Sequence, residues 1–298
     1  MRAKYCDSDE SAIRTLATIV SLSDWRKANL VMLIALDASG SESDQRLFVV
    51  AGFVSSAKDW DAFDLVWRAR LKRDGLTHFH MHRFAHSLEE FKGWDQDENR
   101  RRTLLADLLG ILQSHTYRKF GAIIINRFLT TKLSHENVKT FNLCAYSLAG
   151  LDIAYSALSW AKREAISNLP QLVFEDGDLH KGKLMDSFKQ HGFPAPSFEP
   201  KKDGIDRHGL AVQAFTPLQA ADILAYEILN AYTKIDAGKP LPKLRWPYKQ
   251  LETIPGELKI RTPNGLEELE HGLSSFSETD LQLLEWGAKR TIRDTMIL

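Results

Sequence analysis

The chain has 298 residues, of which 44% are hydrophobic and 26% are charged. This composition is typical of a globular protein with enough apolar side chains for one large core or two modest ones, and it excludes disorder as the default state. The 39 Lys and Arg residues balance the 39 Asp and Glu residues. The whole molecule therefore has no long-range field that gathers nucleic acid, and such binding must depend on a local basic surface.

Cysteine content and hydropathy indicate the compartment. The two cysteines, Cys6 and Cys144, are too few for a disulfide scaffold and lack the paired spacing of a zinc site. The longest apolar run, residues 31–36, is far too short to span a bilayer. We therefore expect a cytoplasmic protein without a membrane partner.

Five segments have the composition of strands. Residues 31–36 form a continuous apolar run that is typical of a strand buried on both faces, and this run ends at Asp37. A turn-like Ala-Ser-Gly-Ser stretch follows, so we expect the first strand to pair antiparallel with the next β-prone segment. The other segments with strand-like composition are residues 46–55, 117–126, 171–175 and 209–215.

Apolar residues recur at helical spacing before, between and after these strands. We expect helices over residues 10–22, 57–72, 101–113, 180–191 and 217–232, one long helix or two abutting helices over 137–165, and a last helix from residue 278. Pro217 suits the first turn of its helix. The Pro- and Lys-bearing stretch 194–208 is expected to be an exposed loop.

The predicted elements follow the order strand, strand, strand, helix, strand, helix, strand, helix, which is the order of ribonuclease H-like proteins. We therefore expect an α/β fold with a ribonuclease H-like mixed five-stranded sheet flanked by helices. Residues 57–115 are expected to be a helical insertion between strands two and three of a domain that spans residues 31–236. An N-terminal helical extension, 1–30, precedes this domain, and a C-terminal extension, 237–298, is expected to pack on it.

Three acidic residues lie in separate predicted elements. Asp37 ends the first strand, Glu175 ends the fourth, and Asp222 lies in the helix after the fifth. In the ribonuclease H-like arrangement these positions converge at one edge of the sheet. Three carboxylates can hold Mg²⁺ or Mn²⁺, which prefer oxygen ligands. A pair of such ions activates an attacking water and stabilises the leaving oxygen, so this pattern favours phosphodiester hydrolysis.

Each acid also has a purely structural interpretation. Asp37 precedes a Ser-Gly turn and can cap it, and Glu175 opens a Glu-Asp-Gly-Asp stretch that can be a solvated charge cluster. Asp222 is more informative, because helical spacing places it on one stripe with Gln219 and Tyr226 beside the apolar face. A buried carboxylate requires a metal, a hydrogen-bond donor or a salt-bridge partner.

Four motifs, taken together, resemble the bacterial domain-of-unknown-function family 3800 over roughly residues 31 to 235. They are Leu-Asp-Ala-Ser-Gly at 36–40, Phe-His-Met-His at 79–82, Val-Phe-Glu-Asp-Gly-Asp at 173–178 and Pro-Leu-Gln-Ala-Ala-Asp at 217–222. The resemblance implies a ribonuclease H-like fold and a nuclease site in which Asp37, Glu175 and Asp222 are the catalytic residues and metal ligands. Ala38 stands where many relatives carry an acid, which implies a site with one negative charge fewer.

The same motifs imply supporting roles for Ser39, His80, Asp178 and Gln219. Asp178 follows Glu175 across a glycine turn and is a candidate for a fourth ligand or for a group that supports one. His80 is a candidate for orienting a carboxylate, a water or a phosphate. A packing role for this histidine stays open, as does a zinc-hydrolase reading of His80 and His82, which point to one side if their segment is extended.

Basic residues gather downstream of Glu175. Those considered as contacts to nucleic-acid phosphates are Lys181, Lys183, Lys201 and Lys202. A solvated loop and helix face, balanced by neighbouring acids, is the alternative explanation. No P-loop or dinucleotide-binding glycine motif is present in the sequence.

The sequence therefore predicts a metal-dependent nuclease that cleaves nucleic acid with two Mg²⁺ or Mn²⁺ ions. The alternative hypothesis is a non-catalytic ribonuclease H-like module that binds nucleic acid or a protein within a defence or mobile-element system. The neutral net charge and Ala38 favour this alternative. Whether the substrate is DNA or RNA, and whether the chain forms oligomers, is not decided by the sequence.

Overall fold

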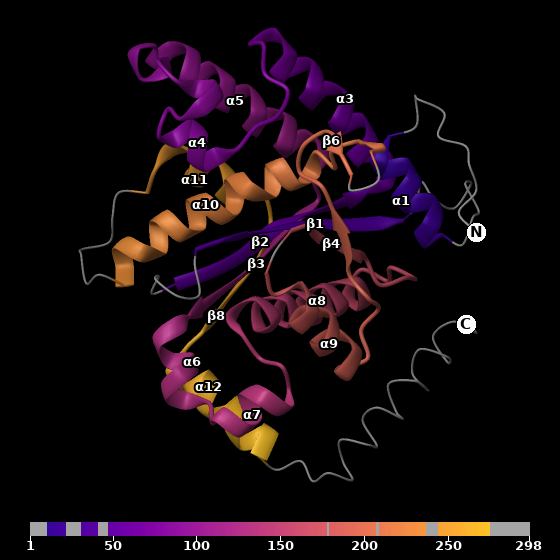
Figure 1. Cartoon of the computed structure of the whole chain (residues 1–298), viewed down its shortest axis with the longest axis vertical. Coiled ribbons are helices and arrows are strands. Elements are labelled where there is room, and N and C mark those ends of the chain that lie inside the picture. Colours follow the sequence, from indigo (N-terminus) through magenta and orange to yellow (C-terminus); the bar gives the residue numbers. More distant parts are fainter. Residues whose placement is uncertain are drawn as a thin grey trace.

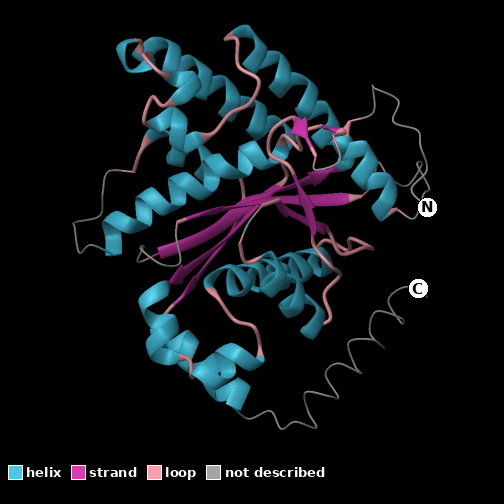
Figure 2. Cartoon of the chain, viewed as in Figure 1, coloured by secondary structure: helices cyan, strands magenta, loops and turns pink. Residues whose placement is uncertain are grey.

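A computed structural model describes residues 11–21, 31–40, 47–177, 179–206, 209–236 and 244–274 of the chain. A six-stranded sheet with helices on both of its faces forms the centre of the molecule (Figures 1 and 2). Its strands are β1 (Met32–Ser39), β2 (Leu47–Ser56), β3 (Arg118–Ile125), β4 (Gln171–Glu175), β5 (Ser197–Glu199) and β8 (Gly256–Arg261).

The strand order in the sheet is β5-β4-β1-β2-β3-β8. β2 pairs antiparallel with both β1 and β3, as expected for strands that follow one another in the chain. β4 is parallel to β1, β5 is parallel to β4, and β8 is parallel to β3. β2 therefore runs opposite to the other five strands, and the sheet is mixed but mostly parallel.

Helix α10 lies directly on one face of the sheet, where it contacts β1 and β2 (Figure 1). The segment between β2 and β3 is helical, as predicted. It packs against α10, and its helix α3 also contacts the sheet directly. The helices on this side are α1 (Ala12–Val20), α3 (Ala57–Arg73), α4 (Met81–Ala85), α5 (Glu98–His115), α10 (Pro217–Asp236) and α11 (Trp246–Glu252), with two short 3-10 helices, η1 (Glu89–Phe91) and η2 (Trp94–Gln96).

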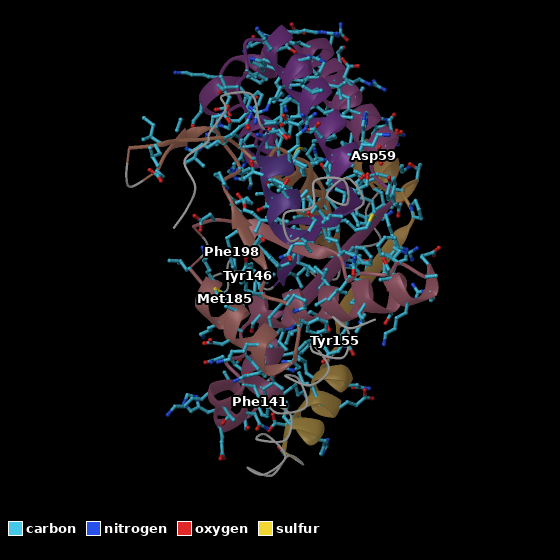
Figure 3. All side chains as sticks on the ribbon, turned by 90° about the vertical axis from the view of Figure 1, so that its right-hand side faces the viewer. Asp59, Phe141, Tyr146, Tyr155, Met185 and Phe198 are labelled. Atoms are coloured by element: carbon cyan, nitrogen blue, oxygen red, sulfur yellow. The ribbon has the colours of Figure 1, made fainter. Side chains whose placement is uncertain are left out.

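Helix α8 covers the opposite face of the sheet, and the labelled Asp59 of α3 and Tyr155 of α8 in Figure 3 mark the two sides. The helices on this side are α6 (Asn126–Lys132), α7 (His135–Thr140), α8 (Ala145–Arg163), α9 (Lys181–Gln190) and α12 (Pro263–Ser274). The predicted helical stretch 137–165 thus contains two helices. Among the described residues, no helix combines the length and the hydropathy needed to cross a membrane.

Strand alternation divides the apolar side chains between two cores. Leu33 and Ala35 of β1 belong to the core shared with α10, whereas Ile34 and Leu36 belong to the core shared with α8. All four side chains are fully buried. The continuous apolar run of the first strand is therefore explained by helices on both faces of the sheet.

The predicted fifth strand at residues 209–215 is wrong. Within this stretch, β7 (Ala211–Val212) pairs with β6 (Gly204–Ile205) in a separate two-stranded ribbon. The strand that follows β4 in the sheet is β5, which lies inside the stretch 194–208 that was predicted to be an exposed loop. β5 has three residues, which are too few for an alternation of apolar and polar residues to identify it.

The predicted count of five strands is also wrong, because β8 adds a sixth strand beside β3. β8 comes from the Pro- and Gly-rich stretch that was predicted to be a C-terminal extension. Its residues are half-buried or exposed, as expected for a polar strand at the edge of a sheet, and this explains why no apolar pattern indicated it. The helix predicted from residue 278 lies outside the described residues.

A close approach between β1 and β2 gives a test of the sheet register. A Cβ atom on Gly52 would lie 1.7 Å from the backbone oxygen of Ala35. We expect Gly52→Ala to lower the free energy of unfolding by about 3 kcal/mol, because the strands would have to separate. Gly110→Ala in α5 is the matched control, since a Cβ there has no neighbour within 4 Å.

The control should raise the free energy of unfolding by about 0.5–1 kcal/mol, because alanine has the higher helix propensity. Urea unfolding of both variants and of the wild type measures the two effects. A Gly52→Ala protein as stable as the wild type would contradict the register of β1 and β2.

Candidate functional site

Strand register positions Asp37 beside Glu175. β1 and β4 are parallel, with Leu36 opposite Phe174, so Asp37 and Glu175 are the next residues along the two strands. Leu36 and Phe174 belong to the core on the α8 side. By alternation, Asp37 and Glu175 face the α10 side. Asp37 was predicted to be the last residue of its strand, but β1 continues to Ser39.

Helix α10 contributes Asp222 to the same place. The side chain of Asp222 is 8% exposed and that of Asp37 is 3% exposed. The backbone N–H of Met81 donates a hydrogen bond of 2.6 Å to Oδ2 of Asp222. The negative charge of Asp222 raises the pKa of Asp37, as expected for two carboxylates that lie close together. The structure thus brings together Asp37, Glu175 and Asp222, which we call the carboxylate cluster.

The ammonium of Lys201 lies within this cluster. Its Nζ is 2.8 Å from Oδ2 of Asp37 and 2.7 Å from Oε2 of Glu175. The Lys201 side chain is only 10% exposed. The prediction that Lys201 lies on an exposed loop is therefore wrong, because the chain after β5 turns its side chain inward.

A register argument explains how Lys201 reaches the cluster. Glu199 of β5 lies opposite Glu175 in parallel pairing, and Lys201 follows Glu199 by two residues. Alternation therefore directs Lys201 to the face that carries Glu175. This signal exists in the sequence, but it can be used only when β5 has been recognised as a strand.

Burial dominates the electrostatics of the cluster. Burial raises the pKa of Asp37 to about 6, although the charge of Lys201 opposes this rise. Burial also raises the pKa values of Glu175 and Asp222, again against Lys201. For Lys201, burial acts to lower the pKa, but the three carboxylates outweigh it and raise the pKa. The ammonium therefore stays charged, and it faces three carboxylates.

Gln219 joins three segments beneath the cluster and is fully buried. Its Nε2 donates to the backbone oxygen of Lys201 at 2.8 Å. Its Oε1 accepts from Nε1 of Trp67 and from the backbone N–H of Phe79, both at 2.9 Å. Gln219 therefore fixes the segment that carries Lys201 relative to α3 and to the segment before α4.

His80 lies next to Asp222, with Nδ1 of the imidazole 3.5 Å from Oδ2 of the carboxylate. Burial lowers the pKa of His80 to about 4, and the positive charges of Lys201 and Arg83 contribute to this shift. At neutral pH His80 is therefore an uncharged imidazole, and the contact with Asp222 is not an ion pair. Its buried Nδ1 has no hydrogen-bond partner among the described residues.

The remaining predicted residues form no hydrogen bond or ion pair with the cluster among the described residues, or they lie outside the described part of the chain. Ser39 is the last residue of β1. Lys181 pairs with Asp176 at 2.7 Å and lies over the ring of Phe198, which packs against the core on the α8 side. Lys183 and Lys202 are exposed. Asp178 falls outside the described residues.

Two further sequence inferences are corrected. α4 begins at Met81, so His82 lies on a helix and not on an extended segment with His80. The side chain of Ala38 packs against the core on the α8 side. An acid at position 38 would therefore point away from Asp37, and the alanine does not lower the charge of the carboxylate cluster.

The carboxylate oxygens of the cluster are ligands that a hard cation prefers, but those of Asp37 and Glu175 already contact the ammonium of Lys201. Within the part of the chain that the structure describes, no group of three or more His, Cys, Asp or Glu side chains is arranged to hold a metal ion. Asp37 and Glu175 share the ammonium of Lys201. The two carboxylates are thus already positioned to share one cation.

Comparison with known proteins gives no relative. No family model matches the chain, and neither a curated protein nor a solved structure matches it. The function must therefore be inferred from the geometry and charge of the carboxylate cluster.

The raised pKa of Asp37 predicts a dependence of stability on pH. Because the pKa of Asp37 is higher in the folded than in the unfolded chain, protonation of Asp37 stabilises the folded state. This stabilisation is fully present below about pH 4 and is lost as the pH rises through about 6. Asparagine resembles the protonated acid. Without divalent metal, we expect Asp37→Asn to be more stable than the wild type by up to about 3 kcal/mol above this range, and equally stable below it.

Urea unfolding across this pH range measures the difference. Asp95→Asn, at an exposed acid, is the matched control. A loss of stability in Asp37→Asn at neutral pH would show that the ion pair with Lys201 outweighs the burial of charge.

Proposed function

We propose that this chain has a ribonuclease H-like fold, belongs to the domain-of-unknown-function family 3800 and is a metal-dependent nuclease. The chain order β1, β2, β3, α8, β4, α9, β5, α10 supports the fold, because it is the order that the resemblance implies. The antiparallel β1, β2 and β3 and the parallel β4 and β5 support it as well. In this proposal β8 and the helices between β2 and β3 are additions to that arrangement.

The observation that carries the proposed activity is the meeting of three buried or half-buried carboxylates from β1, β4 and α10 around one ammonium. Three negative charges against one positive charge leave an uncompensated charge of about −2, and burial makes such an excess unfavourable. A divalent cation with a preference for oxygen ligands would neutralise it. Asp37, Glu175 and Asp222 would hold Mg²⁺ or Mn²⁺.

The bound metal would supply activation of water and stabilisation of the leaving oxygen of a phosphodiester. The residues of the chain hold and complete the site. The Met81 N–H fixes Asp222, and Gln219 fixes the backbone at Lys201. The ammonium of Lys201 can donate a charge-assisted hydrogen bond to a phosphate oxygen. His80 presents an uncharged imidazole beside Asp222, and the Nδ1 atom of this ring has no hydrogen-bond partner in the described part of the chain.

The charge count bears on the number of metal ions. One divalent ion together with Lys201 neutralises the three carboxylates, whereas two divalent ions require the ammonium to leave the space between Asp37 and Glu175. We therefore propose that Lys201 competes with a metal ion for this position. Binding of a second ion would need a phosphodiester substrate to balance the added charge.

The alternative function is a non-catalytic module that binds nucleic acid or a protein within a defence or mobile-element system. The observation that favours it is the internal pairing of Asp37 and Glu175 with Lys201, which is sufficient to satisfy both carboxylates without metal. In this case the cluster is a buried structural ion pair. The two functions differ in metal uptake and in the formation of a cleavage product.

Carboxylate variants test the proposed activity. We expect wild type to bind Mn²⁺ by calorimetry and to cleave at least one substrate in a panel of DNA, RNA and hybrids. Asp37→Asn, Glu175→Gln and Asp222→Asn should each reduce cleavage by at least about 100-fold and weaken Mn²⁺ binding, because each removes a ligand. Glu164→Gln, at an exposed acid directly after the end of α8, is the matched control.

Undiminished cleavage by Asp37→Asn, with folding verified by circular dichroism, would remove the cluster from consideration as the active site. No Mn²⁺ binding and no product from wild type, even with substrate present, would select the non-catalytic module.

Replacement of Lys201 tests the competition between the ammonium and the metal. We expect Lys201→Met to bind Mn²⁺ roughly ten-fold more tightly than wild type, because the competing positive charge is absent. Without metal the variant should lose about 3 kcal/mol of stability, since two carboxylates lose their partner, and Mn²⁺ should restore it. Lys189→Met, on the exposed face of α9, is the control.

Calorimetry and thermal unfolding with and without Mn²⁺ give both quantities. A Lys201→Met protein that is destabilised but gains no affinity for Mn²⁺ would identify the ion pair as purely structural.

A further inference from the structure

A cavity of about 310 Å³ lies on the α10 side of the sheet, between residues of α4, α5 and α11. Figure 1 shows how these three helices are arranged. The volume of the cavity is in the range of pockets that bind small ligands. The residues that line it are Phe84, Glu98, Arg101, Arg102, Leu105, Arg245, Trp246 and Pro247. None of these residues belongs to the carboxylate cluster.

The lining combines an aromatic surface with guanidinium groups. Phe84 and Leu105 are buried and form an apolar floor. Trp246 is 36% exposed, although it is large and apolar. The guanidinium of Arg102 lies 5.9 Å from the centre of the Trp246 ring, and that of Arg101 lies 4.9 Å from the Phe84 ring. Exposed aromatic rings beside arginines are the groups that bind bases and phosphates.

The positive charge of the cavity is only partly compensated. Arg101 lies 3.7 Å from Glu98, whose side chain is 83% exposed, so this ion pair is weak. Arg245 lies 3.5 Å from the buried Glu227. The ion pairs formed among the described residues do not include Arg102, which is exposed. The cavity therefore has an excess of positive charge next to the Trp246 ring.

A band of polar rings connects the cavity to the carboxylate cluster. From the cluster outward, His80 contacts Asp222, and the ring centres of His80 and His82 are 6.4 Å apart. The rings of His82 and His86 follow at 4.6 Å. His82 and His86 are exposed, so this part of the band is open to solvent.

Tyr226 links the band to the cavity. Its hydroxyl lies 3.4 Å from Nε2 of His86, and its ring centre lies 5.9 Å from the guanidinium of Arg245. Tyr226 also follows Asp222 by one turn of α10. A chain of side-chain contacts thus links the cavity to the cluster, and two of its members, Asp222 and Tyr226, lie on α10.

We propose that this cavity is a subsite for one nucleotide of a single-stranded nucleic acid, whose backbone continues along the histidine band to the carboxylate cluster. The base stacks on Trp246, and Arg102 and Arg245 contact the phosphates. A single strand is favoured because its unpaired bases expose the faces that stack on Trp246, whereas neighbouring base pairs cover these faces in a duplex. The inference rests on the proposed nuclease function and names its substrate class.

The test measures binding without metal, so that it does not depend on cleavage. The probes are fluorescein-labelled single-stranded DNA and RNA and the matching duplex, and fluorescence anisotropy in a chelating buffer gives the dissociation constants. Trp246→Ala should weaken single-strand binding roughly ten-fold, because stacking is lost. Arg102→Gln should weaken binding and reduce the slope of log affinity against log salt concentration by about one.

The matched controls lie on the opposite face of the sheet. They are Arg163→Gln and Tyr155→Ala on α8, where Arg163 is 54% exposed and Tyr155 is 42% exposed. Both should bind the probes like wild type. Arg102→Gln keeps the inference testable if Trp246→Ala fails to fold, because Arg102 is exposed on the surface of α5.

Three results would overturn the subsite: no binding of single strands by wild type, equal affinities of the Arg102 and Trp246 variants and their controls, or tighter binding of the duplex. Cleavage in metal with unchanged affinity of the variants would keep the nuclease and reject the subsite. Binding that depends on Arg102 and Trp246 without any product would keep the subsite and reject the nuclease.

Discussion

The contact of Lys201 with Asp37 and Glu175 is the charge interaction on which the arrangement of the α10 side depends. Two neighbouring parallel strands each place a carboxylate on the same face, and burial without a partner would make each of them unfavourable by several kcal/mol. The chain after β5 supplies the partner. β5 must therefore pair with β4 and turn beneath α10, although its three residues have little strand-forming tendency of their own.

Helix α10 is the second element of this arrangement, because its side chains accept hydrogen bonds from the backbone of the segment before α4. Gln219 and Asp222, three residues apart, accept hydrogen bonds from the backbone N–H groups of Phe79 and Met81, two residues apart. One stripe of a helix thus holds one side of an extended segment. These hydrogen bonds fix the helical insertion to α10, and they satisfy a buried amide and a buried carboxylate at the same time.

The sequence predicted those site residues whose neighbours have a regular pattern. Asp37 and Glu175 end apolar runs, and Asp222 lies beside an apolar helical stripe. These local patterns, together with the predicted order of strands and helices, were the basis for expecting the three acids to lie close together. Lys201 was predicted only as a phosphate contact on a loop, and its pairing with Asp37 and Glu175 was missed, because its inward orientation depends on the pairing of β5 with a chain-distant strand. β8 was missed for a similar reason, since the edge of a sheet accepts polar residues and leaves no apolar pattern. Both positions depend on pairing between strands that are distant in the chain, and this pairing cannot be recognised from local composition.

The exposure of the site residues indicates how a substrate would approach. Asp37 and Asp222 are almost fully buried, whereas the side chains of Glu175 and His80 are 39% and 35% exposed. Solvent therefore reaches the cluster on the side of these two residues. The band of rings that leads to the arginine-lined cavity begins at His80. The solvent-exposed side of the cluster therefore adjoins the same band as the cavity. A neutral molecule can in this way present positive charge to a polyanion locally, without a long-range field.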